Sequence, residues 1–279
     1  MEILRISAFS EGDTGGNPAG VLISDAHPST EKMQEIAAEV GFSETAFAMR
    51  QGSGSWRVRY FSPQSEVPFC GHATIALGSA LARKFGDDVY SLELNETDIT
   101  VEGKSAGNQF QAALQSPKTH SQPASEDLTN QVLDLFGLHR DQIDTRIPPA
   151  VVHGGANHFA LTLNSRQALS DMVYDQETGR KLMEENGWVT ITLAVSENNQ
   201  LFHTRNPFAS GGVYEDPATG AASAAYAGYL RDISWPHQGK IEIIQGVDMG
   251  APSRIFAEIP DEKGSSIRVS GSARLMEAN

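Results

Sequence analysis

Cysteine is nearly absent from this 279-residue chain, which contains only Cys70. A single cysteine cannot form an internal disulfide, and this fits a reducing compartment. The N-terminal residues 1–5 (MEILR) lack a basic segment followed by a long apolar run, so they predict no signal peptide. No apolar stretch has the length and composition of a transmembrane helix. We therefore expect a cytoplasmic protein with no membrane partner.

Positive charge is also scarce. Lys and Arg number 21 against 35 Asp and Glu, which gives a net charge of −14. This balance argues against broad electrostatic binding to nucleic acid or to anionic membranes. It does not exclude a small anionic metabolite, because the N-terminus of a helix can bind an anion within an acidic protein. The length allows either one large domain or two of ordinary size.

Common cofactor and metal motifs are missing. The chain has no dinucleotide-binding fingerprint, no P-loop and no His-Glu-x-x-His motif. His153, His158 and His203 are scattered without the spacing of metal ligands. The sequence therefore predicts no metal site.

Two short stretches stand out against this background, residues 67–74 (VPFCGHAT) and 215–220 (EDPATG). Each leads into a run of small and apolar residues, 71–82 and 218–230, with no formal charge if His72 is neutral. A helix that is apolar all round is a buried helix. We predict two buried helices, each wrapped by sheet, with their N-termini facing one cleft.

The remaining elements follow from hydrophobic periodicity and from capping residues. Ser29 or Thr30 begins a helix that Gly41 ends. Further predictions are a polar linker over 116–125, an amphipathic helix over 126–136, a helix over 167–185 broken near Thr178-Gly179, and hairpins over 45–61 and 188–205.

The predicted elements recur in the second half of the chain, which indicates an internal duplication. Gly41 matches Gly187, and Cys70 matches Asp216 at the same offset (216 − 70 = 146). The duplication predicts an N-terminal half over 1–115, joined by the C-terminal strand 266–279, and a C-terminal half over 116–265. Two similar halves often bind a ligand where they meet.

Asp216 and Cys70 occupy equivalent places before the two buried helices. Asp216 precedes Pro217 and is expected at the helix N-cap, where capping is one explanation of its presence. The alternative is that free backbone amides of residues 218–221 hold a carboxylate there. Cys70 is either a small core residue or, with its pKa lowered by the helix N-terminus, a thiolate.

His72 and Glu44 complete the set of candidate residues. His72 lies in the first turn of its helix, where the dipole disfavours imidazolium, although a structural histidine is an equal alternative. Glu44 shares a strand face with Ala46 and Ala48, so it points toward the helix or the cleft unless it is a surface residue. If it is buried, desolvation would raise its pKa toward the range of a proton shuttle. Its counterpart in the second half is Thr190.

Four motifs together resemble the phenazine-biosynthesis PhzF-like family: residues 16–19 (GNPA), 42–47 (FSETAF), 68–74 (PFCGHAT) and 215–220 (EDPATG). The resemblance spans essentially the whole chain. It implies the diaminopimelate-epimerase-like α/β (α+β) fold, with two pseudo-symmetric halves that each wrap a curved, mostly antiparallel sheet around a central helix. It also implies isomerase chemistry without a cofactor, and a homodimer.

The resemblance also implies roles for individual residues. Glu44 would move a proton between carbons of a small anionic metabolite, with His72 and Asp216 as its catalytic partners. The implied substrate-binding residues are Asn17, Cys70, Gly71, Asn157, Thr219, Gly220 and Ala221. Phenazine-type members usually have Ser where this chain has Ala221, so a hydrogen bond to the phenazine precursor would be missing.

Two other functions remain open at this point. Epimerases of this fold use two opposed cysteines at these helix starts, and Cys70 with Asp216 would be the corresponding pair here. The scaffold would also suit an interaction protein without catalytic activity.

Overall fold

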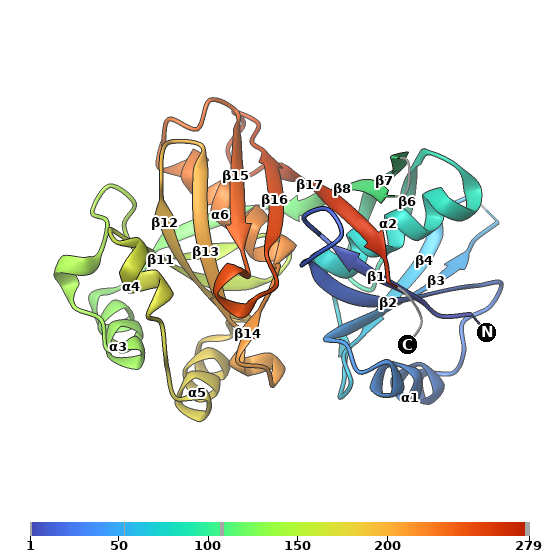
Figure 1. Ribbon diagram of the computed structural model, residues 1–279, viewed down its shortest axis with the longest axis horizontal. Helices are drawn as coiled ribbons and strands as arrows, with labels where there is room; N and C mark the ends of the chain where they lie inside the picture. The colour runs from blue at the N-terminus through green and yellow to red at the C-terminus, as the bar shows by residue number, and fades with distance from the viewer. Residues whose placement is uncertain (1, 53, 107–108, 277–279) are drawn as a thin grey trace.

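The computed structural model describes residues 2–52, 54–106 and 109–276. Two halves lie side by side, one around helix α2 (Gly71–Phe85) and the other around helix α6 (Gly220–Asp232) (Figure 1). Every residue from Gly71 to Ala82 and from Gly220 to Arg231 is buried. The mixed α/β architecture and the two buried helices are therefore as predicted. None of the helices in the described ranges is both long and apolar enough to cross a membrane.

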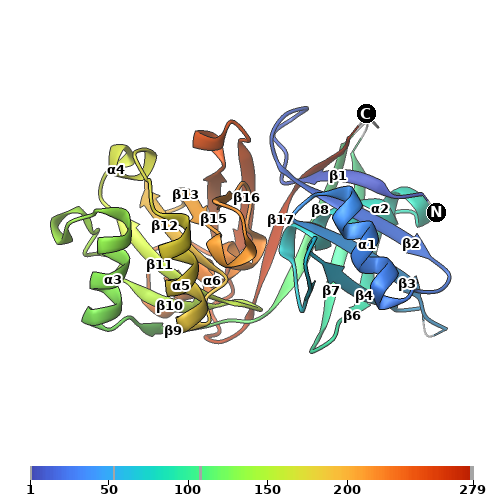
Figure 2. The same cartoon turned by 90° about the horizontal axis from the view of Figure 1, so that it is seen from below.

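The first half surrounds α2 with strands on several sides. Its elements are β1 (Leu4–Ala8), β2 (Asn17–Ser24), α1 (Thr30–Val40), β3 (Glu44–Arg50), β4 (Trp56–Phe61), β5 (Glu66–Val67), β6 (Asp88–Glu93), β7 (Asp98–Ala106) and β8 (Gln109–Lys118). The last strand, β17 (Ser266–Leu275), pairs with β1 and β8 and also with β16 of the second half. Figure 2 shows β17 and β8 passing between the halves. Met1 and residues 277–279 lie outside the described residues.

The second half repeats this plan around α6. Its other elements are β9 (His120–Pro123), α3 (Glu126–Phe136), η1 (Arg140–Gln142), β10 (Ala150–His153), β11 (Asn157–Leu163), α4 (Arg166–Ser170), α5 (Gln176–Asn186), β12 (Thr190–Ser196), β13 (Leu201–Pro207), η2 (Ala209–Gly211), β14 (Glu215–Asp216), β15 (Lys240–Gln245), η3 (Val247–Met249) and β16 (Ser253–Glu258). Most strand pairs are antiparallel. The parallel pairs β2–β3 and β4–β6 recur as β11–β12 and β13–β15, which is the internal duplication in structural form.

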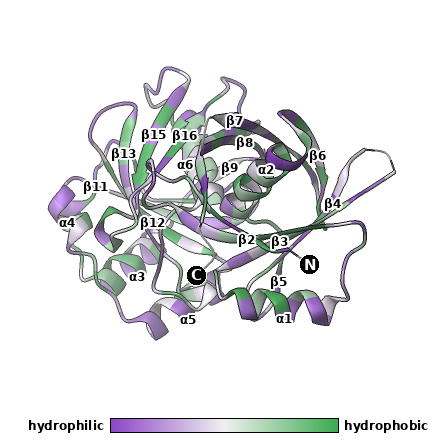
Figure 3. Cartoon of the chain, turned by 45° about the vertical axis from the view of Figure 1, so that its right-hand side comes forward, coloured by the Kyte–Doolittle hydropathy of each residue, from purple (hydrophilic) through white to green (hydrophobic). Residues whose placement is uncertain are grey.

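The outer helices begin and end at the residues that their capping chemistry favours. In α1, the Ser29 hydroxyl accepts a hydrogen bond from the Lys32 backbone amide, and Gly41 adopts the left-handed conformation that ends the helix. Met33 and Ile36 are among its buried residues. Figure 3 shows α1 beneath β3, with hydrophobic residues among hydrophilic ones.

Three sequence predictions need correction. The 116–125 segment is not a linker, because β8 extends into it and β9 pairs with β10. The predicted helix over 167–185 is two helices, and the break falls after Ser170 because Asp175 caps the amide of Thr178 to begin α5. The second buried helix starts at Gly220 with Thr219 as its N-cap, so Asp216 is not its capping residue.

Candidate active site

The N-termini of the two buried helices touch. A Cβ atom added to Gly71 would lie 2.8 Å from the backbone nitrogen of Ala221 and 2.9 Å from Cα of Gly220. Glycine is therefore required at position 71 for this approach. Because the first-turn N–H groups of a helix have no partners within the helix, the two N-termini place unpaired donors and two positive dipole ends in one region.

A cavity of about 450 Å³ opens at this meeting point, between residues of both halves. Its wall contains most of the predicted site residues: Glu44, Cys70, Gly71, His72, Asp216, Thr219, Gly220 and Ala221. Its apolar part includes Phe42, Phe69 and Phe208. None of the described residues that line it is Lys or Arg, so a bound carboxylate would depend on the helix N-termini.

Glu44 begins β3 and is 5% exposed, so it is not a surface glutamate. Its Oε2 atom lies 3.3 Å from Nε2 of His72, but no residue in the described ranges makes a hydrogen bond to it. His72 is itself buried, with Nε2 3.3 Å from the Ser43 hydroxyl and Nδ1 3.4 Å from Sγ of Cys70. The carboxylate is therefore held beside an imidazole, and its Oε2 atom faces Nε2 of His72 without a hydrogen bond between them.

Cys70 is the N-cap residue of α2, although its side chain makes no capping hydrogen bond. Of the two alternatives for Cys70, the thiolate is wrong. Burial and the nearby charge of Glu44 raise the pKa of the thiol well above its usual range. These two effects outweigh the helix dipole that was expected to lower this pKa. Cys70 is a protonated thiol at neutral pH.

Asp216 is buried in β14 and receives hydrogen bonds on both oxygens. Asn17 Nδ2 donates to Oδ1 at 2.7 Å, and the Thr219 hydroxyl donates to Oδ2 at 2.5 Å. Asn17 also donates to the carbonyl of Ala218 at 2.9 Å, so it connects the first half to the start of α6. Burial raises the pKa of Asp216 to about 6, with the charge of Glu44 adding to the effect and His72 opposing it.

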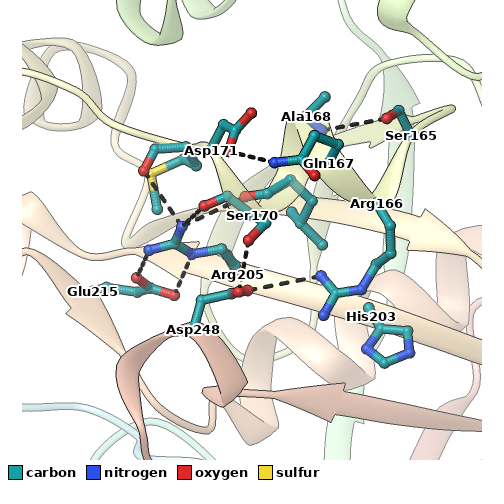
Figure 4. Close-up of polar contacts among 12 residues, drawn as sticks. Ser165, Arg166, Gln167, Ala168, Ser170, Asp171, His203, Arg205, Glu215 and Asp248 are labelled. Atoms are coloured by element: carbon teal, nitrogen blue, oxygen red, sulfur yellow. Dashed lines mark hydrogen bonds and ion pairs between the residues drawn. The ribbon is translucent and has the colours of Figure 1, made fainter.

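Two side chains that no local pattern selects, Gln245 and Arg205, hold the segment around Asp216 in place. Gln245, at the end of β15, is fully buried and donates to the Asp216 carbonyl at 2.7 Å. Arg205 of β13 binds both carboxylate oxygens of the adjacent Glu215, at 3.0 and 2.5 Å, and donates to the carbonyl of Ser170 at 2.9 Å. Figure 4 shows this buried pair together with the neighbouring contacts of Asp248.

Two predicted substrate-binding residues, Asn17 and Asn157, do not line the cavity. Asn17 contacts Asp216, which does line it, whereas Asn157 lies elsewhere. Asn157 itself is exposed, and its Oδ1 lies 2.8 Å from Nδ1 of His153 on the neighbouring strand β10. Neighbouring residues of a strand point to opposite faces, and it is His158 that lies in the cavity wall. The loose match of Asn157 to Asn17 selected a residue one position away.

The same cluster has donors that suit a metal ion. Ligand atoms of Glu44, Cys70 and His72 all lie within 4.8 Å of one another. Carboxylate, thiolate and imidazole are zinc ligands. The sequence spacing of histidines did not reveal this group, because its members come from two elements that meet only in the fold. Metal binding there would require loss of the Cys70 proton.

Comparison with known proteins shows the family of this chain. A family model described as "Phenazine biosynthesis-like protein" matches residues 6–278. Trans-2,3-dihydro-3-hydroxyanthranilate isomerase of Pseudomonas aeruginosa is 31% identical over 275 residues, which cover 95% of this chain and 94% of that protein. An uncharacterized isomerase of Bacillus subtilis, YfhB, is 27% identical over 276 residues, covering 96% and 93%.

Solved structures agree with the fold. The PhzF-family phenazine biosynthesis protein of Bacillus anthracis superposes with a TM-score of 0.84 at 21% identity, covering 99% of this chain and 98% of that one. The family match extends over nearly the whole chain, and the named relatives are isomerases. This chain therefore belongs to the phenazine biosynthesis-like (PhzF) family and is an isomerase of that family.

Proposed function

We propose that this isomerase moves a proton between carbons of a small carboxylate-bearing metabolite, without a cofactor, in the cavity between its halves. Glu44 takes the proton from one carbon and returns it to another on the same face of the substrate. The facing N-termini of α2 and α6 hold the substrate carboxylate. The apolar wall that contains Phe42, Phe69 and Phe208 suits the carbon skeleton.

The observation that carries this proposal is the state of the Glu44 carboxylate. It is almost completely buried in the cavity wall, and Oε2 has no hydrogen-bond partner in the described part of the chain. A buried polar atom normally has a partner, so a free one in a cavity marks a position where a ligand supplies it. A carboxylate in such a place is a suitable general base once a C–H group lies against it.

His72 and Asp216 support the reaction from the two halves. His72 lies within 3.3 Å of Glu44 and can share the transferred proton. Asp216 is held by Asn17 and Thr219 at the start of α6, where it can orient a polar group of the substrate.

Replacement of Glu44 tests the assignment. Glu44→Gln keeps the size of the side chain and removes its basicity, so turnover should fall by roughly 10²-fold or more while ligand affinity and unfolding temperature change little. The probe is trans-2,3-dihydro-3-hydroxyanthranilate, the substrate named for the relative from Pseudomonas aeruginosa. A set of small cyclic and linear carboxylates extends the screen. Full turnover in Glu44→Gln would refute the role of Glu44.

Epimerisation by Cys70 and Asp216 is the second candidate function. It is supported by their shared cavity and by the charge of Asp216, which contributes to the raised pKa of Cys70. In that scheme the thiol donates a proton and the carboxylate accepts one. Cys70→Ala distinguishes the schemes, because it should leave turnover within about twofold if Glu44 is the base and should abolish turnover if Cys70 reacts.

A further inference from the structure

His158 is a buried residue of the cavity wall that takes no part in the proposed proton transfer. It lies on β11, opposite Thr190 of β12 in the parallel register, and its side chain is 0% exposed. Nδ1 lies 2.8 Å from the Thr190 hydroxyl. Nε2 is buried and has no hydrogen-bond partner among the residues that the structure describes.

The contacts of Thr190 determine which ring nitrogen carries the proton. The Thr190 hydroxyl donates to Oδ1 of Asn206 at 3.3 Å, and the Thr192 hydroxyl donates to the same oxygen at 2.8 Å. A hydroxyl has one proton, so with that proton directed to Asn206, Thr190 accepts a hydrogen bond from Nδ1–H of His158. Nε2 is then unprotonated and has a lone pair.

Burial keeps this imidazole neutral. Desolvation lowers the pKa of His158 to about 3, so the ring is uncharged at any pH near neutrality. A group that is so weakly basic is a poor proton acceptor in catalysis. It remains a good hydrogen-bond acceptor, because a neutral imidazole accepts at one nitrogen while it donates at the other.

The internal duplication shows how this arrangement relates to Glu44. Glu44 is paired with Ala19 across β2–β3, and Thr190 is paired with His158 across β11–β12. The first half thus presents a carboxylate at this position. The second half replaces the carboxylate by a threonine and uses that threonine to orient a histidine on the neighbouring strand.

We propose that Nε2 of His158 accepts a hydrogen bond from a hydroxyl or ammonium group of the substrate, and so selects carboxylates that also carry such a donor. The inference rests on the proposed function, since it assigns a second recognition point to the same cavity. A substrate without the donor would bury Nε2 unpaired, and unpaired buried acceptors are strongly disfavoured. His158 is a specificity-determining residue, and Thr190 and Asn206 are its positioning residues.

Binding of matched ligands tests the proposal. The probes are benzoate, the three hydroxybenzoates and the corresponding methoxybenzoates, whose rings suit the aromatic wall, with Kd measured by calorimetry. In the wild-type protein, at least one hydroxybenzoate should bind roughly tenfold or more tightly than benzoate and its methoxy analogue. In His158→Phe, that ratio should fall to within about twofold. His139→Phe changes an exposed histidine of the same half and should preserve the ratio.

The wild-type protein provides a second test that does not depend on folding of a variant. ¹⁵N chemical shifts of the His158 ring should show a protonated Nδ1 and an unprotonated Nε2, and the preferred ligand should shift Nε2. A protonated Nε2, absence of any preference for the hydroxylated probes, or an unchanged preference in His158→Phe would overturn the inference. Binding is measured without turnover, so the two proposals can fail separately. A protein that shows His158-dependent selectivity but no isomerase activity would refute the isomerase mechanism and leave this inference standing.

Discussion

Asp216 shows how strongly the surroundings of one residue decide its chemistry. Burial favours its neutral form, while donors on both carboxylate oxygens favour the ionised form. The outcome is a pKa of about 6, above the ordinary value of 3.8. The two hydrogen bonds fit the ionised carboxylate, so we expect that form to be active.

The pH dependence of catalysis should report this group. We predict that kcat/KM rises with pH through about 6 as Asp216 loses its proton. Asp216→Asn should remove this limb and lower kcat/KM by roughly tenfold or more at neutral pH. Glu39→Gln, which changes an exposed residue of α1, should leave the profile intact. Persistence of the same limb in Asp216→Asn would show that another group titrates there.

At the scale of elements, the contact between α2 and α6 is the feature on which the site depends. Both helices start with glycine, and the two glycines face each other. A side chain at either position would separate the N-termini that form the floor of the cavity. A Cβ atom at Gly71 would lie closer to its neighbours than a Cβ atom at Gly220, so substitutions at the two positions test the contact.

A series of glycine-to-alanine variants should give graded effects. Gly71→Ala places its Cβ 2.8 Å from a backbone nitrogen and should lower the free energy of unfolding by about 1–3 kcal/mol, with a large loss of kcat. Gly220→Ala, whose nearest contact is 3.3 Å, should have a smaller effect on both. Gly52→Ala meets no atom within 4 Å and serves as the control. Urea denaturation and turnover measure the series, and equal effects of all three variants would contradict the close approach.

The Arg205–Glu215 pair is the second feature at this scale, because it anchors β14 immediately before Asp216 (Figure 4). Removing one partner leaves the other charge buried without compensation. Arg205→Met should therefore cost about 3–5 kcal/mol of unfolding free energy. Arg205→Met combined with Glu215→Leu should recover a substantial part of that loss. If the double variant is as unstable as the sum of the two single variants, the pair is not coupled as the structure indicates.

At the scale of the whole molecule, the duplication explains most of what the sequence could predict. The offset of 146 brought Cys70 into alignment with Asp216, and both lie at the N-terminal side of a buried helix in the fold. Uncharged small-residue runs predicted α2 and α6 because few other structures bury such sequences. The homodimer and the cytoplasmic location stay predictions.

The remaining features depend on contacts between distant segments. Gln245 and Arg205 reach Asp216 and Glu215 only after β13, β14 and β15 assemble, and no local pattern marks either residue. Asn157 was selected rather than its neighbour His158 because a loose repeat match does not determine which face of a strand a residue occupies. The predicted start of α6 was wrong because Asp-Pro is a strong capping signal, whereas Asp216 here pairs with Asn206 in a short strand.

The central claim is that Glu44 transfers a proton between substrate carbons. Turnover of trans-2,3-dihydro-3-hydroxyanthranilate, or of any carboxylate found active in the screen, should be followed by NMR in deuterated water. The account predicts product formation with the wild-type protein, with deuterium on carbon to the extent that the proton held by Glu44 exchanges with solvent before its return. Both product and deuterium should be lost in Glu44→Gln but not in Cys70→Ala or Glu39→Gln. Undiminished deuterium incorporation by Glu44→Gln would contradict it.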